Sequence, residues 1–211
     1  MWLDPRAATG RPGLRPVKRR LDEDLLTPTE IAAVVRACST RSASGVRNAA
    51  MIAIAWRSGP RLGEVLALQT KDIDHAGGTL VVQHGKGDKR RVVGFDGGAI
   101  ALVERWLKMR QRIGLRHYDL VFTTLAGQPI DQSYVRHLLP RLARRAGIAK
   151  RVHAHGLRHA YAVELEREGA SVTQIRDLLG HSSLAVTDQY LRRLGASDAV
   201  EFSRRREWSL V

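Results

Sequence analysis

Apolar residues recur at helical spacing over most of the chain, which predicts a mainly helical domain. Residues 27–30 read Thr-Pro-Thr-Glu, the pattern of a helix start with a threonine N-cap, a proline in the first turn and a glutamate that reaches back to the cap. Residues 46–57 are almost wholly apolar, so we expect a central core helix there. A third helix is expected to open at Pro60 and to carry Arg61 in its first turn.

The period changes from helical to extended between residues 72 and 95. Strand-forming residues fill 79–82 and 91–95, and the glycine-containing segment 84–89 between them is typical of a hairpin tip. A short strand within 71–74 would complete a three-stranded meander. These patterns predict an α+β fold, mainly α, in which a helical domain carries a small three-stranded antiparallel sheet.

The second half of the chain returns to helical spacing. Residues 99–107 form an amphipathic pattern that ends before Gly114, and residues 120–122 indicate a short buried strand or an extended link. Asp131 is expected to cap the next helix, and Pro140 is expected to bend it. Two more helical patterns follow towards the C-terminal end, and the second of them is short.

The charge balance indicates a polyanionic partner. The chain has 211 residues, enough for one domain with a full core, and its 35 Lys and Arg against 21 Asp and Glu give a formal charge of +14. A protein this basic favours a polyanion, and nucleic acid is the usual one. The alternative is a solvated basic surface without a partner.

Cysteine content and the N-terminal sequence exclude other classes. The single cysteine, Cys38, excludes an internal disulfide and a cysteine-rich zinc site, and its helical surroundings predict a small packed apolar residue. No run of about 18 apolar residues occurs, and the first residues carry Arg and Pro, so neither a membrane span nor a signal peptide is predicted. We expect a cytoplasmic or nucleoid-associated protein.

The segment from His153 to Tyr190 carries the clearest chemistry. It reads H-A-H-G-L-R-H, then an apolar helical pattern, then G-H-S-S-L-A-V-T-D-Q-Y. On a helix, His155 and Arg158 would project from one face, which places a guanidinium fork beside an imidazole and suits a phosphate. His181 follows a predicted helix end, and a tyrosine comes nine residues later. A second histidine and a phenol could therefore return to the same face.

The motif H-x-L-R-H followed by L-G-H-S-S-x-x-V-T-x-x-Y resembles the tyrosine recombinases, the phage integrase family, and the resemblance runs from about Thr27 to Leu191. It implies that family's catalytic fold and DNA strand exchange by transesterification, without a metal or other cofactor, through a 3′-phosphotyrosyl intermediate. It also implies double-stranded DNA as the partner and a homotetramer on that DNA. In this family a helical DNA-clamping domain precedes the linker, and we expect this chain to have no room for one.

The resemblance extends to three upstream positions. Arg61, in Ser-Gly-Pro-Arg, matches the family's first catalytic arginine, and Glu64 matches the acidic position three residues later. The alternative is an ordinary ion pair at a helix start. Lys86, in Gly-Lys-Gly on the predicted hairpin, matches the catalytic lysine and would protonate the leaving 5′ oxygen.

The remaining roles implied by the resemblance concern charge and proton transfer. Arg61 and Arg158 would stabilise the nonbridging phosphate oxygens, and His181 would donate a further hydrogen bond. His155 would act as base or proton relay for Tyr190, the nucleophile, because a phenol has an ordinary pKa of about 10. Of the four tyrosines, only Tyr190 has the family's distance from a Gly-His pair.

The flanking segments and other basic residues complete the expected organisation. Residues 1–26 combine prolines, glycines and basic residues, which predicts an extended arm or linker that follows DNA. Residues 192–211 form a C-terminal tail that would pack on a neighbouring protomer, as in related recombinases, or fold back on its own domain. The domain itself is placed at residues 27–191. The expected contacts to DNA phosphates are Lys89, Arg90, Arg91, Arg141, Arg144, Arg145, Lys150 and Arg151.

Three alternatives stay open. His153, His155 and His159 have metal-compatible spacing, so a zinc hydrolase is conceivable, but no carboxylate or cysteine lies close in sequence and Arg158 would put a fixed cation beside the metal. A type IB topoisomerase would share the chemistry. A non-catalytic DNA-binding or inhibitory remnant is the third alternative, and the missing clamp domain motivates it.

Overall fold

The structure is a computed structural model that describes residues 25–83, 90–115 and 119–181. Predictions for residues 1–24 of the N-terminal arm, the hairpin tip with Lys86 and Lys89, and the C-terminal segment with Tyr190 and the tail fall outside these residues, whereas Leu26, placed in the arm, is buried in the core. The elements, in chain order, are α2 (Pro28–Arg36), α3 (Ala43–Arg57), α4 (Leu62–Ala67), the 3₁₀ turn η1 (Thr70–Asp72), β1 (Ile73–Asp74), β2 (Thr79–Val82), β3 (Arg91–Gly94), α5 (Gly97–Arg112), α6 (Gln132–Arg145), α7 (Ala154–Arg167) and α8 (Val172–Leu179).

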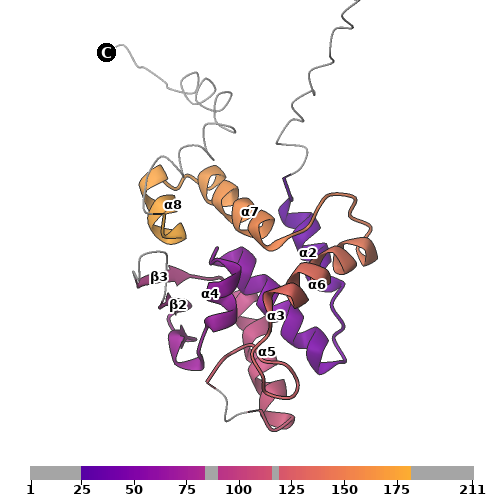
Figure 1. Cartoon of the computed structure of the whole chain (residues 1–211). Coiled ribbons are helices and arrows are strands. Elements are labelled where there is room, and N and C mark those ends of the chain that lie inside the picture. Colours follow the sequence, from indigo (N-terminus) through magenta and orange to yellow (C-terminus); the bar gives the residue numbers. More distant parts are fainter. Residues whose placement is uncertain (1–24, 84–89, 116–118, 182–211) are drawn as a thin grey trace, which may run out of the picture.

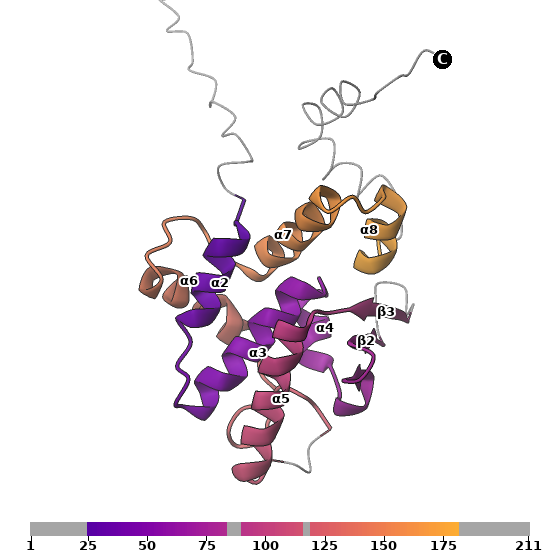
Figure 2. The ribbon, with the colours of Figure 1, turned by 180° about the vertical axis from the view of Figure 1, so that it is seen from behind.

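Helix α3 forms the centre of the core. It packs against α2, α4, α5 and α7, and its path through the middle of the molecule is visible in Figure 2. The predicted core helix is confirmed, but it begins at Ala43, three residues before the expected start at Val46. The reason is a cap that the apolar pattern does not contain: the Ser42 hydroxyl accepts a hydrogen bond from the backbone N–H of Gly45 at 3.2 Å.

The predicted start of α2 is confirmed in detail. The backbone N–H of Thr27 donates to Glu30 Oε2 at 2.8 Å, and the backbone N–H of Glu30 donates to the Thr27 hydroxyl at 3.2 Å. These two bonds satisfy amide groups that a helix start leaves without intrahelical partners.

The predicted three-stranded antiparallel sheet is also confirmed, in the order β1-β2-β3. Its register pairs Leu80 with Ile73 on one side and with Val93 on the other. Leu80 and Val93 are buried, whereas Val92 is 55% exposed, so one face of the sheet packs on the domain. Residues 120–122 form a link without a regular strand, with bends at 121 and 122, and an isolated bridge between Leu120 and Gln69 joins it to the residues between α4 and η1.

Helices α5 and α6 cover the core further. Asp131 caps α6 as predicted, with its carboxylate accepting from the Ser133 N–H at 2.7 Å, and Pro140 lies within that helix. The fully buried Trp106 of α5 donates its indole N–H to the Val121 carbonyl at 2.7 Å, which ties α5 to the link at residues 120–122. Cys38 is buried, as predicted.

Helices α7 and α8 build the side of the molecule where the predicted chemistry lies. In both views α7 lies between α8 on one side and α2 and α6 on the other (Figure 1). Tyr161 of α7 packs with Ile175 and Leu179 of α8 in a small apolar cluster of their own, so this tyrosine is a core residue as expected. Within the described residues, no helix is both long and apolar enough to span a membrane.

Candidate active site

Arg61 and Glu64 form the first edge of the candidate site. Helix α4 begins at Leu62, two residues after the predicted opening at Pro60, so Arg61 is its N-cap with extended backbone angles and its predicted place within the first turn is wrong. Glu64 Oε2 accepts from the backbone N–H of Arg61 at 2.8 Å, and Glu64 Oε1 accepts from Arg61 Nη1 at 2.9 Å. The Arg61 side chain is 36% exposed and that of Glu64 only 6%. The buried Glu64 carboxylate therefore fixes the Arg61 guanidinium from the protein side, and part of the guanidinium stays exposed to solvent.

Arg158 is the buried arginine of the candidate site. It is 5% exposed, and its terminal nitrogens donate to the Gly59 carbonyl at 2.7 Å and to the Leu179 carbonyl at 2.6 Å. The side chain thus joins α7 to the loop before Arg61 and to the last turn of α8. Arg158 also lies close enough to the two candidate histidines to lower the pKa of both.

His155 and His181 both lie near the positive charges of Arg158 and Arg61. Burial lowers the pKa of His155, and the nearby His153, Arg158 and Arg61 lower it further. Burial also lowers the pKa of His181 to about 4, with contributions from Arg158, Arg61, Arg91 and His155. Both imidazoles are therefore neutral near pH 7, so His155 can accept a proton and His181 can donate a hydrogen bond without adding charge.

His155, Arg158 and His181 line one small hollow, together with His159, Ala162 and Leu179. Arg61 approaches the same place from α4, with Nη2 at 3.5 Å from the Gly180 carbonyl. Four of the predicted catalytic residues, from segments about 120 positions apart in sequence, are therefore gathered at one point.

Arg91 lies inside the protein instead of on the DNA-facing surface expected for it. Its side chain is 9% exposed and forms an ion pair with Glu64 at 2.6 Å, and its Nε donates to the Leu178 carbonyl at 3.0 Å. A contact to a DNA phosphate is not expected of a guanidinium used in this way. The neighbouring Arg90 is exposed and remains a candidate for such a contact.

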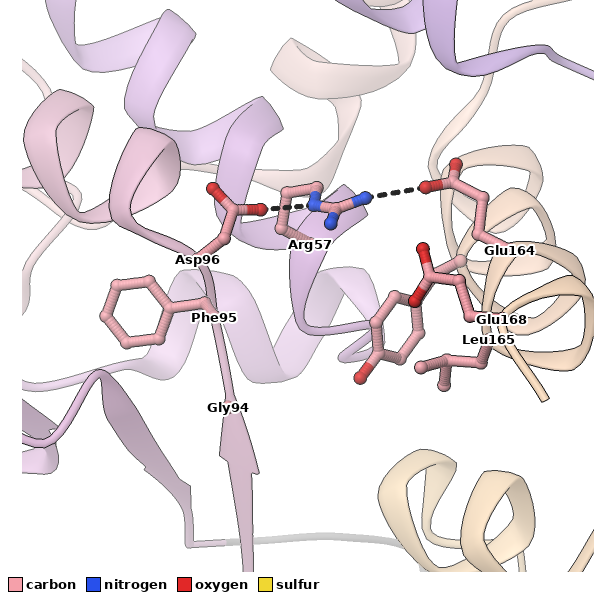
Figure 3. A pocket seen from close by; sticks show the side chains of 8 residues that line it. Arg57, Gly94, Phe95, Asp96, Glu164, Leu165 and Glu168 are labelled. Carbon is pink, nitrogen blue, oxygen red and sulfur yellow. Dashed lines mark hydrogen bonds and ion pairs between the residues drawn. The ribbon is translucent and has the colours of Figure 1, made fainter. Parts of the chain in front are cut away.

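An ion cluster at the end of α3 supports the loop that carries Arg61. Arg57 bridges Asp96, the N-cap of α5, and Glu164 of α7, the latter at 2.6 Å (Figure 3). Trp56 donates its indole N–H to the second Glu164 oxygen at 2.6 Å. A cavity of about 180 Å³ lies beside this cluster, lined also by Tyr161 and Glu168. Because Arg57 stands four residues before Arg61, the cluster fixes the chain immediately before the site.

The basic residues of α6 and the following loop form the candidate DNA-facing surface. Val135, Leu138 and Leu142 bury one side of α6. The exposed basic side chains there are Arg136, Arg141, Arg144, Arg145 and Arg151. Lys150 differs, because its Nζ donates to the Leu25 carbonyl at 2.8 Å and to Glu30 at 3.0 Å, and a DNA contact would compete with both bonds.

The histidines do not form a metal site in the described part of the chain. The ring centres of His153 and His155 are 6.5 Å apart, and no three His, Cys, Asp or Glu side chains among the described residues are grouped to hold a metal ion.

Tyr134 is packed in the protein and does not reach the candidate site, because its hydroxyl accepts a hydrogen bond from Arg47 at 2.6 Å. Lys86 and Tyr190 lie outside the described residues, so their roles stay predictions.

Sequence reasoning missed the internal roles of Arg91, Arg57 and Glu164. Arg91 lies 27 positions after Glu64, and Glu164 lies 107 positions after Arg57, so neither pair has a local spacing that would reveal it. The only signal in the sequence is the presence of Arg91 at the start of a strand with an apolar pattern, where a surface position was equally compatible.

Comparisons with known proteins agree with this geometry. A family model described as "Phage integrase family" matches residues 24–195. The tyrosine recombinase XerC of Lactobacillus leichmannii is 31% identical over 180 residues, which are 84% of this chain and 60% of the relative. XerC of Xanthomonas axonopodis pv. citri (strain 306) is 37% identical over 146 residues, 69% of this chain and 47% of the relative.

Solved structures show the same relationship. The XerA recombinase superposes with a TM-score of 0.75 at 28% identity, covering 87% of this chain and 66% of the other. XerH bound to its palindromic difH substrate, in a post-cleavage complex, gives 0.71 at 26% identity, covering 86% and 52%. The chain spans about 60% of the length of the first curated relative that it matches. The predicted family is confirmed: the chain belongs to the phage integrase family, the tyrosine recombinases.

Proposed function

We propose that this chain is a site-specific DNA recombinase that cuts and rejoins DNA without metal, through a 3′-phosphotyrosyl intermediate on Tyr190. The observation that carries the proposal is the convergence of Arg61, Arg158, His155 and His181 at the ends of α4, α7 and α8. Two permanent cations and two neutral imidazoles provide the donors and the proton acceptor that such a transesterification needs.

In the proposed reaction the Tyr190 oxygen attacks the phosphorus and the bond from phosphorus to the 5′ oxygen breaks. The lowered pKa of His155 leaves it neutral near pH 7, so it can take the phenol proton. Arg61 and Arg158 stabilise the charge that develops on the nonbridging oxygens, and His181 donates a further hydrogen bond. Lys86 supplies the proton for the departing 5′ hydroxyl.

The proposed partner is double-stranded DNA. The exposed arginines of α6 supply charge that recognises phosphates independently of sequence. The XerH neighbour is a complex with its difH substrate, which supports DNA as the partner of the related site. We place the catalytic unit at residues 27–191, between a DNA-following arm at 1–26 and a tail at 192–211. The proposed assembly on DNA is a homotetramer. We propose that it acts in the cytoplasm, at the nucleoid.

Trapping on nicked duplexes tests this proposal. The substrates carry the difH site or a randomised core, with a nick that lets the short strand diffuse away after cleavage, so the covalent adduct accumulates. Wild type is expected to give an SDS-resistant protein–DNA adduct that Tyr190→Phe abolishes, whereas Tyr118→Phe, which changes a tyrosine outside the motif, retains it. An adduct that persists in Tyr190→Phe contradicts the assignment of the nucleophile, and absence of any wild-type adduct favours a DNA-binding protein without cleavage.

A further inference from the structure

Arg91 connects three elements of the proposed site. It is the first residue of β3, and its Nη2 and Nη1 donate to Glu64 Oε2 at 2.6 Å and to Glu64 Oε1 at 3.2 Å. Its Nε donates to the carbonyl of Leu178 at 3.0 Å. One planar guanidinium therefore bonds the helix that follows Arg61 and the last turn of the helix that precedes His181.

Glu64 is shared between Arg91 and Arg61. Its Oε1 accepts from Arg61 Nη1 at 2.9 Å as well as from Arg91. Burial alone would raise the pKa of Glu64, but the hydrogen bonds from Arg91 and from the Arg61 backbone outweigh it and hold that pKa below its ordinary value. The carboxylate is therefore charged, and its position depends on both arginines.

The contact with the end of α8 is close-packed. Gly180 ends that helix with a φ of +65°, and a Cβ added to it would lie 2.9 Å from Nη1 and 3.0 Å from Cδ of Arg91. Arg61 Nη2 approaches the carbonyl of the same glycine at 3.5 Å. The backbone directly before His181 thus lies between the two guanidinium groups.

We propose that Arg91 is a positioning residue of the active site: by bridging Glu64 and the Leu178 carbonyl, it fixes Arg61 and His181 relative to each other. Its relevance to catalysis rests on the proposed function. A lysine would not replace it, because one ammonium group cannot reproduce three hydrogen bonds arranged in a planar fork. Catalysis depends steeply on the placement of such groups, and a displacement of about 1 Å costs roughly 100-fold in rate.

The first test needs no DNA. NMR titration of the His181 ring, assigned with His181→Gln, reports the charges that face it: Arg61 from α4, Arg91 from β3, and His155 and Arg158 from α7. Arg91→Gln is expected to raise the His181 pKa above its value of about 4, because one of these cations is lost. The control Arg112→Gln removes the same charge from an exposed position near the end of α5, and it is expected to leave that pKa unchanged.

The second test is single-turnover cleavage at saturating DNA. Arg91→Gln is expected to lower the cleavage rate roughly 10- to 100-fold while the DNA affinity changes less than threefold, because the bridge orients catalytic groups without contacting DNA. Arg91→Lys separates charge from geometry: the His181 pKa is expected to stay near the wild-type value while the rate still falls about 10-fold. Arg112→Gln is expected to match wild type in rate.

The outcomes discriminate between the two proposals. An unchanged His181 pKa in Arg91→Gln, or a wild-type rate in Arg91→Lys, overturns the positioning role. If Arg91→Gln does not fold, as thermal melting would show, the Arg91→Lys protein decides through its rate. If wild type forms no adduct on any substrate, the proposed recombinase function fails, and the NMR titration still decides whether Arg91 is coupled to His181.

Discussion

Substitution of Gly59 by alanine should lower the free energy of unfolding and disturb the backbone that holds Arg158. Gly59 has a φ of +66°, and a Cβ added to it would lie 2.3 Å from Cδ1 and 2.7 Å from Cε1 of Tyr161. That ring is buried, so it cannot move aside into solvent. The carbonyl of Gly59 also accepts the hydrogen bond from Arg158 at 2.7 Å, so a displaced backbone would disturb the candidate catalytic arginine as well.

Two contributions set the expected magnitude. The left-handed backbone conformation costs a residue with a Cβ about 1–2 kcal/mol. Forcing an extra methyl group against a packed ring costs about 1–3 kcal/mol more. The free energy of unfolding of Gly59→Ala is therefore expected to fall by roughly 2–5 kcal/mol in total.

Gly147→Ala provides a matched control. Gly147 has a φ of +70°, but nothing lies within 4 Å of an added Cβ, so only the backbone cost of about 1–2 kcal/mol applies. Urea unfolding followed by tryptophan fluorescence, to which the buried Trp106 contributes, measures both variants. If Gly59→Ala costs no more than Gly147→Ala, the argument from the Tyr161 contact is refuted.

Three further predictions follow from the same structure. Thr27→Ala should lower the free energy of unfolding by about 1 kcal/mol through loss of the cap of α2, and an unchanged urea midpoint would contradict this. His181 has a folded pKa of about 4, below its ordinary value of 6.5, so the unfolded chain binds an extra proton between these pH values. Stability should therefore fall as pH drops through that window, and His181→Gln should flatten the dependence of the unfolding free energy on pH, measured by urea unfolding at each pH, whereas an unaltered dependence would argue against the lowered pKa. Arg144→Gln should weaken DNA binding on all sequences and reduce the slope of log affinity against log salt by about one, while equal salt slopes for Arg144→Gln and the distant Arg112→Gln would remove α6 from the DNA surface.

Local sequence patterns predicted the local parts of the fold. The start of α2, the cap of α6 by Asp131 and the β2–β3 pair depend on residues close together in sequence, and all three were predicted and confirmed. The start of α3 was misplaced because it depends on a side-chain cap, the Ser42 hydroxyl, which the apolar period does not contain.

The candidate site was predictable only in part, for a physical reason. Arg61, His155, Arg158 and His181 stand in recognisable motifs, and the structure brings them together. Arg91 was predicted to contact a DNA phosphate together with its basic neighbours, and only the packing of β3 against α8 turns it inward. Interactions that join distant segments depend on how the helices pack, and short-range periodicity carries no information about that.

Mapping the covalent bond between protein and DNA tests whether the chain stores the DNA linkage on Tyr190, as we propose. The trapped adduct would be digested with nuclease and trypsin and analysed by tandem mass spectrometry, with substrates labelled at either strand end to establish polarity. We predict a nucleotide joined through its 3′ phosphate to Tyr190 in the tryptic peptide 177–192. A nucleotide on any other residue would rule out Tyr190 as the nucleophile, and one joined through its 5′ phosphate would rule out a 3′-phosphotyrosyl intermediate.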